Sequence, residues 1–301
     1  MAKANSREKV ARTEAAPKSG RFVKVPGAEI FVQELGPATG PPIVFIHGFG
    51  AWSETWRPTM EALADKGFRA VAVDVPPFGF SAVTGDEGYS RGEQARRLIA
   101  LLDALEIARV TLVGHSYGGR PTVTAVLQAP DRVERLVLVD AAVGFEADPS
   151  ADREGPGLMQ KLLGIGPLRQ AILATLLTNP RMTRTLLTQF VADPASVSDE
   201  LVGIYQRPLV VQGATHSLGE WVKAQVDAED TVLLDEATYE KLAIPALLVW
   251  GERDTITPLW QGQRLAQWLP SSKLVVLPGI GHLPQAESPP AFQAALLAFL
   301  K

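Results

Sequence analysis

The residues Gly114-His115-Ser116-Tyr117-Gly118 form a G-x-S-x-G motif, with a serine at its centre. An apolar run at residues 110–113 precedes the motif, and a segment with a helical pattern follows it. A G-x-S-x-G motif between a strand and a helix is typical of a nucleophile elbow, in which a strained turn holds the serine hydroxyl clear of the sheet. This setting predicts that Ser116 is a nucleophile.

A serine nucleophile needs a base to accept its proton, and the chain has four histidines from which to choose. His282 follows the last apolar run within a loop that contains Gly279 and Gly281, and we expect it to be the base. We expect His47 to have a structural role at a turn and the ring of His115 to point away from the active site. His216 falls in the predicted helical cap, described below, and is expected on the surface or in packing.

The acid that orients the base has two candidates, Asp254 and Asp140, each just beyond a predicted strand. Both preserve the order serine, acid, histidine along the chain, so order alone does not decide between them. The short turn Gly251-Glu252-Arg253 favours Asp254 as the acid on an open loop. Asp140 is the alternative, and otherwise a hydrogen-bonding turn residue.

Backbone N–H groups must stabilise the negative oxygen that forms when a serine attacks a carbonyl. One is expected from Tyr117, the residue directly after the nucleophile. The other is expected from Phe49, because Gly48 and Gly50 on either side allow backbone to approach a substrate closely. The sequence therefore predicts an oxyanion hole made by Phe49 and Tyr117.

These residues follow short apolar runs that are typical of strands buried on both faces of a parallel sheet. Helical patterns alternate with the runs, which predicts a mostly parallel, doubly wound α/β sheet. Two further strands are expected at residues 22–25 and 29–34. The predicted core strands are residues 42–46, 69–73, 110–113, 136–139, 246–250 and 273–277.

The alternation is interrupted once. Residues 144–243 contain helical stretches and no buried-strand run, which predicts a helical cap inserted into a core made of residues 21–143 and 244–301. Such a cap would cover the carboxyl edge of the sheet, where open α/β folds bind ligands. Residues 1–20 are polar and charged, and we expect them to form a disordered tail.

The chain resembles the α/β-hydrolase superfamily, and within it the capped serine esterases and their relatives. The resemblance runs from about residue 22 onward and is weakest in the cap. One departure is Pro77, which stands where such proteins usually have glycine. The motifs that carry the resemblance are His47-Gly48-Phe49-Gly50, residues 74–81, Gly114 to Gly119, Gly251-Glu252-Arg253-Asp254 and Gly281-His282.

The resemblance implies a fold, a triad and a reaction class. It implies an α/β-hydrolase fold with Ser116, Asp254 and His282 as the triad, and no metal or cofactor. We expect hydrolysis of short-to-medium-chain carboxylic esters. Alternatives on the same triad are a carbon–carbon bond hydrolase, a lactonase and a cofactor-free haloperoxidase or perhydrolase. A non-catalytic small-molecule receptor is a further hypothesis, which the intact triad disfavours.

Single residues separate some branches of the superfamily. Haloalkane dehalogenases and epoxide hydrolases have a carboxylate where Ser116 stands, so the serine argues against both. Carbon–carbon hydrolases commonly have Asn before the nucleophile and a Gly-Pro-Gly type of oxyanion loop. This chain has His115 and Phe49-Gly50-Ala51 at those places.

Composition limits the partners and the compartment. The net charge of -4 gives no basic face for nucleic acid, and the absence of cysteine excludes disulfides and a thiolate nucleophile. The first twenty residues lack the apolar stretch of a secretory signal, and no segment approaches the roughly 18 apolar residues of a membrane span. We expect a soluble, cytoplasmic protein that acts on a small molecule. Neither the natural substrate nor the oligomeric state follows from the sequence.

Overall fold

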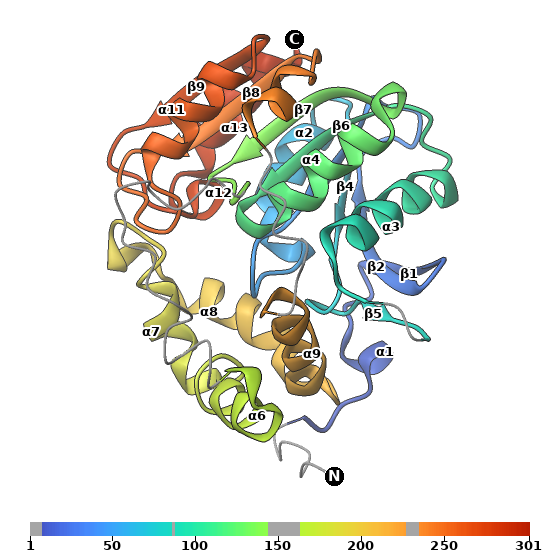
Figure 1. The fold of residues 1–301 in the computed structure, drawn as a ribbon, viewed down its shortest axis with the longest axis vertical. Helices are drawn as coiled ribbons and strands as arrows, with labels where there is room; N and C mark the ends of the chain where they lie inside the picture. Colours follow the sequence, from blue (N-terminus) through green and yellow to red (C-terminus); the bar gives the residue numbers. More distant parts are fainter. Residues whose placement is uncertain (1–7, 86–87, 144–162, 227–234) are drawn as a thin grey trace.

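A central, mostly parallel β-sheet organises the protein (Figure 1). The structure is a computed structural model, and it describes residues 8–85, 88–143, 163–226 and 235–301. The strands, in chain order, are β1 (Gly20–Val25), β2 (Ala28–Leu35), β3 (Pro42–Ile46), β4 (Arg69–Val73), β5 (Ala82–Val83), β6 (Val110–His115), β7 (Val133–Val139), β8 (Ala246–Gly251) and β9 (Ser272–Leu277).

The order of strands in the sheet is β1-β2-β4-β3-β6-β7-β8-β9, and β5 pairs with β2. Strand β2 runs antiparallel to β1, β4 and β5, and every other pairing is parallel. Each of the predicted core runs is a strand of this sheet. The expected α/β-hydrolase fold is therefore confirmed.

Helices cover both faces of the sheet because its central strands are apolar on both sides. Strands β6 and β8 are buried along their whole length. One face packs against α3 (Arg91–Ala104), α4 (Gly119–Gln128) and α11 (Leu259–Trp268), and the other against α2 (Arg57–Ala64) and α13 (Pro289–Leu300). Two separate apolar cores result, one on each face.

A second group of helices lies apart from the sheet, in the lower part of Figure 1. It contains α6 (Gly166–Thr175), α7 (Thr183–Leu187), α8 (Asp199–Gln206) and α9 (Ala214–Val226). Within the described part of residues 144–243, the regular elements are helical. These four helices are called the cap helices below. The division into core and cap at residues 144 and 243 stays a prediction.

Helix α10 (Glu236–Glu240) falls inside the predicted cap range but packs on the sheet side of the molecule. Tyr239 is fully buried in the core cluster that contains α3 and α4, and its ring stacks on Trp268 of α11 at 5.9 Å. The chain has thus returned to the core before β8 begins.

The expected tail differs from the structure from Glu8 onward. Residues 8–16, here called the N-terminal arm, contain helix α1 (Arg12–Ala15) and lie against the segment before α9. Val10 accepts a hydrogen bond from the Gln212 N–H at 3.0 Å, and its own N–H donates to the Val210 carbonyl at 3.2 Å. The last residue of the expected tail, Gly20, begins strand β1.

Charged side chains of the arm explain why this polar segment is held in place. The Glu8 carboxylate accepts the N–H groups of Gly213 and Thr215 at 3.0 and 2.9 Å, at the N-terminal end of α9. A carboxylate at that position satisfies free N–H groups and interacts favourably with the helix dipole. At the other end, Arg12 donates to the Phe80 carbonyl at 2.9 Å and pairs with Glu29 of β2. The arm therefore connects α9 to the sheet.

Among the described residues, no helix is both long and apolar enough to cross a membrane.

Candidate active site

Ser116 lies at the sharp turn between β6 and α4. Its φ of 50° is in the left-handed region, which is rare for a residue other than glycine. The turn is so tight that a Cβ atom added at Gly118 would lie only 2.5 Å from the His47 carbonyl oxygen. The strained serine and the obligatory glycine are features of a nucleophile elbow.

A chain of hydrogen bonds joins Ser116, His282 and Asp254. The Ser116 Oγ lies 2.8 Å from His282 Nε2, and His282 Nδ1 lies 2.7 Å from Asp254 Oδ2. These residues come from three loops at the ends of β6, β9 and β8, and all are at least nine-tenths buried. The structure thus brings together the predicted nucleophile, base and acid.

The Asp254 carboxylate is held by its own loop. Its Oδ1 accepts the N–H groups of Ile256 and Thr257 at 2.7 and 3.0 Å, and its Oδ2 accepts the Thr257 hydroxyl at 2.6 Å. Burial acts to raise the pKa of Asp254, but the hydrogen bond and charge of His282 and the Thr257 hydroxyl outweigh it, so that its pKa lies below the usual value. The acid therefore stays ionised beside the base.

Asp140, the alternative acid, lies next to this group but does not contact the His282 ring nitrogens. Its Oδ1 accepts the Gly251 N–H at 2.8 Å, and its Oδ2 has no hydrogen-bond partner among the described residues. Burial, together with the negative charge on Asp254, raises the pKa of Asp140 well above its ordinary value. Asp254, and not Asp140, therefore occupies the position against the predicted base.

Asp140, Asp254 and His282 also form the one cluster of histidine and acidic side chains, within the described ranges, that is compact enough to hold a metal ion. Both ring nitrogens of His282 and both oxygens of Asp254 already make hydrogen bonds. A metal would have to break the Ser116-His282-Asp254 chain, so we assign no metal to this cluster.

The predicted oxyanion loop lies directly against the nucleophile. A Cβ atom at Gly48 would lie 2.9 Å from the Cβ of Ser116, so a side chain there would displace the elbow. The N–H of Phe49 donates to no other group in the described part of the chain, and the N–H of Tyr117 follows the serine directly. Their role as an oxyanion hole remains a prediction that this arrangement allows.

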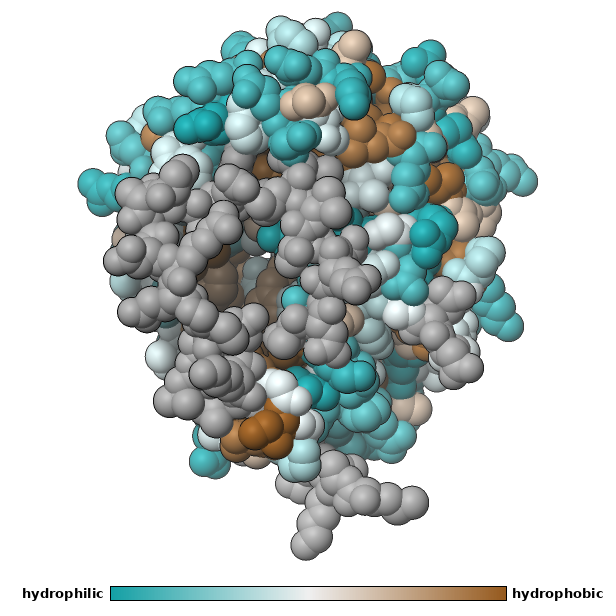
Figure 2. Space-filling view, in the orientation of Figure 1, coloured by the Kyte–Doolittle hydropathy of each residue, from teal (hydrophilic) through white to brown (hydrophobic). Residues whose placement is uncertain are grey.

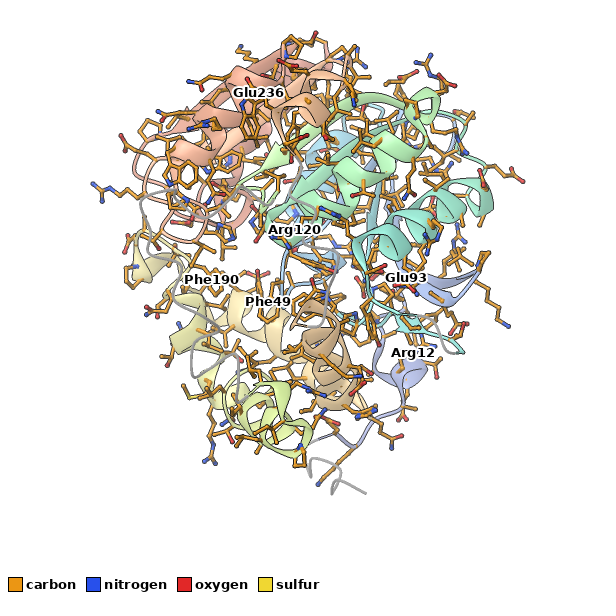
Figure 3. All side chains as sticks on the ribbon, in the orientation of Figure 1. Arg12, Phe49, Glu93, Arg120, Phe190 and Glu236 are labelled. Atoms are coloured by element: carbon orange, nitrogen blue, oxygen red, sulfur yellow. The ribbon has the colours of Figure 1, made fainter. Side chains whose placement is uncertain are left out.

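A cavity of about 160 Å³ opens above Ser116 and His282, between the sheet and the cap helices. Figure 2 shows a hollow near the middle of this face with apolar residues visible inside it. Figure 3 shows Phe49 and Phe190 between the sheet side and the cap helices, and both line the cavity. The remaining walls from the cap are largely aliphatic: Leu177, Leu186, Leu187, Leu209, Ala214 and Leu218.

The model of the alpha/beta hydrolase fold family matches residues 41–289, which is most of the chain. The chain belongs to this family. It is an α/β-hydrolase, and a hydrolytic activity follows from that membership together with its relatives.

Individual relatives are similar over almost their whole length. This α/β-hydrolase is 30% identical to a 2-hydroxymuconate semialdehyde hydrolase of Pseudomonas sp. (strain CF600), over 95% of each chain. It is similar in structure to the meta-cleavage product hydrolase CumD of Pseudomonas fluorescens IP01, with a TM-score of 0.76, 25% identity and coverage of 93% and 97% of the two chains. A bromoperoxidase from Bacillus anthracis has a TM-score of 0.75 and 25% identity over 94% and 99%. These names do not support ester specificity over other acyl chemistry.

The other three histidines of the α/β-hydrolase lie outside the Ser116-His282-Asp254 chain. The Nε2 of His47 accepts the Val75 N–H at 2.9 Å and its Nδ1 donates to the Gly48 carbonyl at 2.7 Å, so the expected structural role agrees with the geometry. Burial lowers the pKa of His47 to about 4. His216 is exposed on α9.

His115 departs from the expectation that its ring points away from the active site. His115 is among the residues that line the cavity, and its ring centre lies 5.1 Å from that of His282. Its Nε2–H donates to the His282 backbone carbonyl at 2.8 Å. The sequence carried no signal for this contact, because the two residues are 167 positions apart and only the fold brings them together.

Proposed function

We propose that this protein is a serine hydrolase in which Ser116 attacks a carbonyl carbon and forms an acyl-serine intermediate. The proposal rests above all on the unbroken hydrogen-bond chain from Ser116 through His282 to Asp254. A buried serine, imidazole and carboxylate in this order are the parts that such a reaction needs.

The proposed reaction has two halves. The Ser116 Oγ attacks the carbonyl carbon while His282 Nε2 takes its proton, and the N–H groups of Phe49 and Tyr117 stabilise the negative oxygen. The imidazolium of His282, held by Asp254, then gives that proton to the leaving group. In the second half, His282 activates a water that attacks the acyl-serine and returns the proton to Ser116.

We propose a carbon–carbon bond as the bond that is cleaved, with support from the relatives. The 2-hydroxymuconate semialdehyde hydrolase and the meta-cleavage product hydrolase are matched over more than nine-tenths of this chain. Cleavage of such a bond expels a carbanion, which is feasible when a second carbonyl in the substrate spreads the charge as an enolate. The imidazolium of His282 would protonate that carbon.

Esters are the second candidate, and the small apolar cavity favours them. Its volume of about 160 Å³ lies below the ~300–1,000 Å³ that is usual for pockets of drug-sized ligands, which suits a compact acyl group. An alcohol is also a better leaving group than a carbon acid, so the same triad would suffice. Lactones and peracids would pass through the same intermediate.

A panel of four substrates tests these proposals: p-nitrophenyl butyrate, a γ-lactone, a 2-hydroxy-6-oxo-dienoate, and acetate with hydrogen peroxide for perhydrolysis. We expect the dienoate to give the highest kcat/KM, followed by the ester. The reverse order would make the protein an esterase and contradict the carbon–carbon proposal.

Ser116→Ala is the matched test of the mechanism, with Ser271→Ala at an exposed position as its control. The first should abolish turnover and labelling by a fluorophosphonate, and the second should change neither. Turnover that survives Ser116→Ala would contradict the acyl-serine mechanism. Binding of the panel compounds without turnover would instead support a small-molecule receptor.

A further inference from the structure

We infer that His115 is a positioning residue for the proposed base, because its ring N–H holds the backbone carbonyl of His282 and ties the base loop to the nucleophile elbow. This inference rests on the proposed function, since it takes His282 as the base. It assigns a role to the residue that directly precedes the nucleophile.

The His282 residue is restrained at each of its four polar groups. Its two ring nitrogens contact Ser116 and Asp254. Its backbone N–H donates to the Phe190 carbonyl at 2.7 Å, and its backbone carbonyl accepts from His115 Nε2 at 2.8 Å. Two of these restraints come from the nucleophile elbow: Ser116 contacts the ring, and His115, at the end of β6, is the one that holds the backbone of His282.

His115 itself has little freedom to move. It is the last residue of β6 and is 2% exposed, and its ring lies edge-on to Trp56, with centroids 6.2 Å apart. On its Nδ1 side it meets the Gly48 backbone so closely that a Cβ atom at Gly48 would lie 2.7 Å from Nδ1. A side chain that packing holds in place can position another loop more accurately than a mobile one.

The protonation state of His115 is fixed by its partners. A carbonyl oxygen only accepts, so the proton lies on Nε2, and Nδ1 is left without a partner among the described residues. Burial, and next the charge of His282, lower the pKa of His115 to about 3. A neutral ring can hold the carbonyl without opposing the positive charge that His282 acquires during proton transfer.

The hydrogen bond should matter for rate rather than for binding. His115 does not need to touch the substrate to act, because it sets where the His282 ring lies relative to the Ser116 hydroxyl. A misplacement of a catalytic group by about 1 Å can cost about 100-fold in rate. Loss of one restraint out of four should cost less, and we expect about tenfold in kcat.

Two substitutions separate the hydrogen bond from the space that the ring fills. His115→Gln keeps an N–H at a reach similar to that of Nε2, whereas His115→Leu keeps apolar volume and removes the donor. We expect His115→Leu to lower kcat for p-nitrophenyl butyrate about tenfold with KM within about twofold, and to slow labelling by a fluorophosphonate in proportion. His115→Gln should restore both rates to within about threefold of the original protein.

Thermal unfolding of each variant shows whether it is folded, and Val126→Ala, on the buried face of α4, is the control for a general loss of stability. If His115→Leu does not fold, His115→Asn replaces it, since its amide is too short to reach the carbonyl and should lose rate similarly. A folded His115→Leu or His115→Asn with unchanged kcat would overturn the inference. Equal losses in the Gln and Leu variants would also overturn it.

The two proposals fail in different ways. If Ser116→Ala keeps turnover, the serine mechanism fails whatever the His115 variants do. If turnover depends on Ser116 but not on the donor at position 115, only the positioning role fails.

Discussion

The two walls of the cavity are built on different principles. On the sheet side, Ser116, His282 and Asp254 are fixed by directional hydrogen bonds between loops that follow neighbouring parallel strands. On the cap side, α6 to α9 and the segments between them present mainly aliphatic side chains. Hydrogen bonds therefore fix the positions of the polar side chains on the sheet side, whereas apolar packing sets the shape of the cavity on the cap side. Under the proposed function, we expect the sheet edge to determine the chemistry and the cap to determine which acyl group fits.

Hydrogen bonds and ring packing join the two walls near the site. The Phe190 carbonyl accepts the His282 N–H, and Trp221 of α9 donates from its indole to the Tyr117 hydroxyl at 3.0 Å. Phe49, Phe78, Tyr117 and Trp221 pack their rings against one another at 5.2–5.8 Å, which connects the oxyanion loop to α9. Movement of α9 would thus shift Phe49 and Tyr117 through the aromatic packing.

Asp254→Asn should cause the largest effect, because it replaces the predicted acid on the sheet side of the cavity. The amide cannot support the imidazolium, and a loss of about 10⁴-fold in kcat is expected in steady-state assays. Asp140→Asn is the matched control, since the amide oxygen can still accept the Gly251 N–H and Asp140 makes no hydrogen bond to the His282 ring, and kcat should fall less than about fivefold. The opposite result would move the acid to Asp140.

Leu218→Ala tests the apolar cap side of the cavity. Leu218 is buried and lines the cavity from α9, so its truncation should admit a longer acyl chain. The ratio of kcat/KM for p-nitrophenyl octanoate over butyrate should rise about tenfold, the size of effect expected for a few methylene groups in an apolar pocket. Leu176→Ala, at a cap residue that is 42% exposed, should leave the ratio unchanged. A fall in kcat for both esters with no change in ratio would show that the cap wall also sets geometry.

Acid should lower the stability of the fold through the buried His115. The pKa of His115 falls from 6.5 to about 3 on burial, so between these values the unfolded chain binds a proton that the folded chain does not. The free energy of unfolding should therefore decrease as the pH falls below about 6.5, with a slope of at most about 1.4 kcal/mol per pH unit from this residue.

Urea unfolding at several pH values measures that slope. His115→Gln should make it shallower, and His216→Gln, at an exposed residue of α9, should leave it as it is. Equal slopes in the original protein and His115→Gln would mean that His115 does not resist protonation in the fold.

Glu8→Gln should give the smallest effect, because it acts on the cap only through the N-terminal arm. Removing the charge that accepts the Gly213 and Thr215 N–H groups should lower the free energy of unfolding by about 1 kcal/mol. Glu14→Gln is the control in the same thermal or urea unfolding experiment, because Glu14 lies within α1 and its side chain makes no hydrogen bond to the described residues of α9. Equal stabilities of the two variants would show that the Glu8 contacts do not stabilise the cap.

The sequence was sufficient for the features that depend on local pattern. Continuous apolar runs located the central strands, since residues buried on both faces of a sheet need no alternation. Parallel strands end at one edge, so loops after β6, β8 and β9 could be expected to bring Ser116, Asp254 and His282 together.

Features that depend on distant partners could not be predicted. The donor role of His115 depends on a backbone carbonyl in another loop, and any residue can supply such a group. The order of the arm depends on Glu8 meeting free N–H groups about two hundred positions away. Helix α10 falls in the predicted cap range because residues 144–243 contain helical stretches and no buried-strand run, and only the burial of Tyr239 reveals its place against the core.

The arm has a consequence for protein engineering. By covalent order it precedes the first strand, but its hydrogen bonds brace residues 210–215, next to the cavity wall formed by Pro208, Leu209, Ala214 and Leu218. In a chimera that keeps residues 8–16 of this chain but has the cap of a relative, the arm would face a cap segment that does not offer the same hydrogen-bond partners. Exchange of substrate range between members of the family should succeed more often when the arm and the cap are transplanted as one unit.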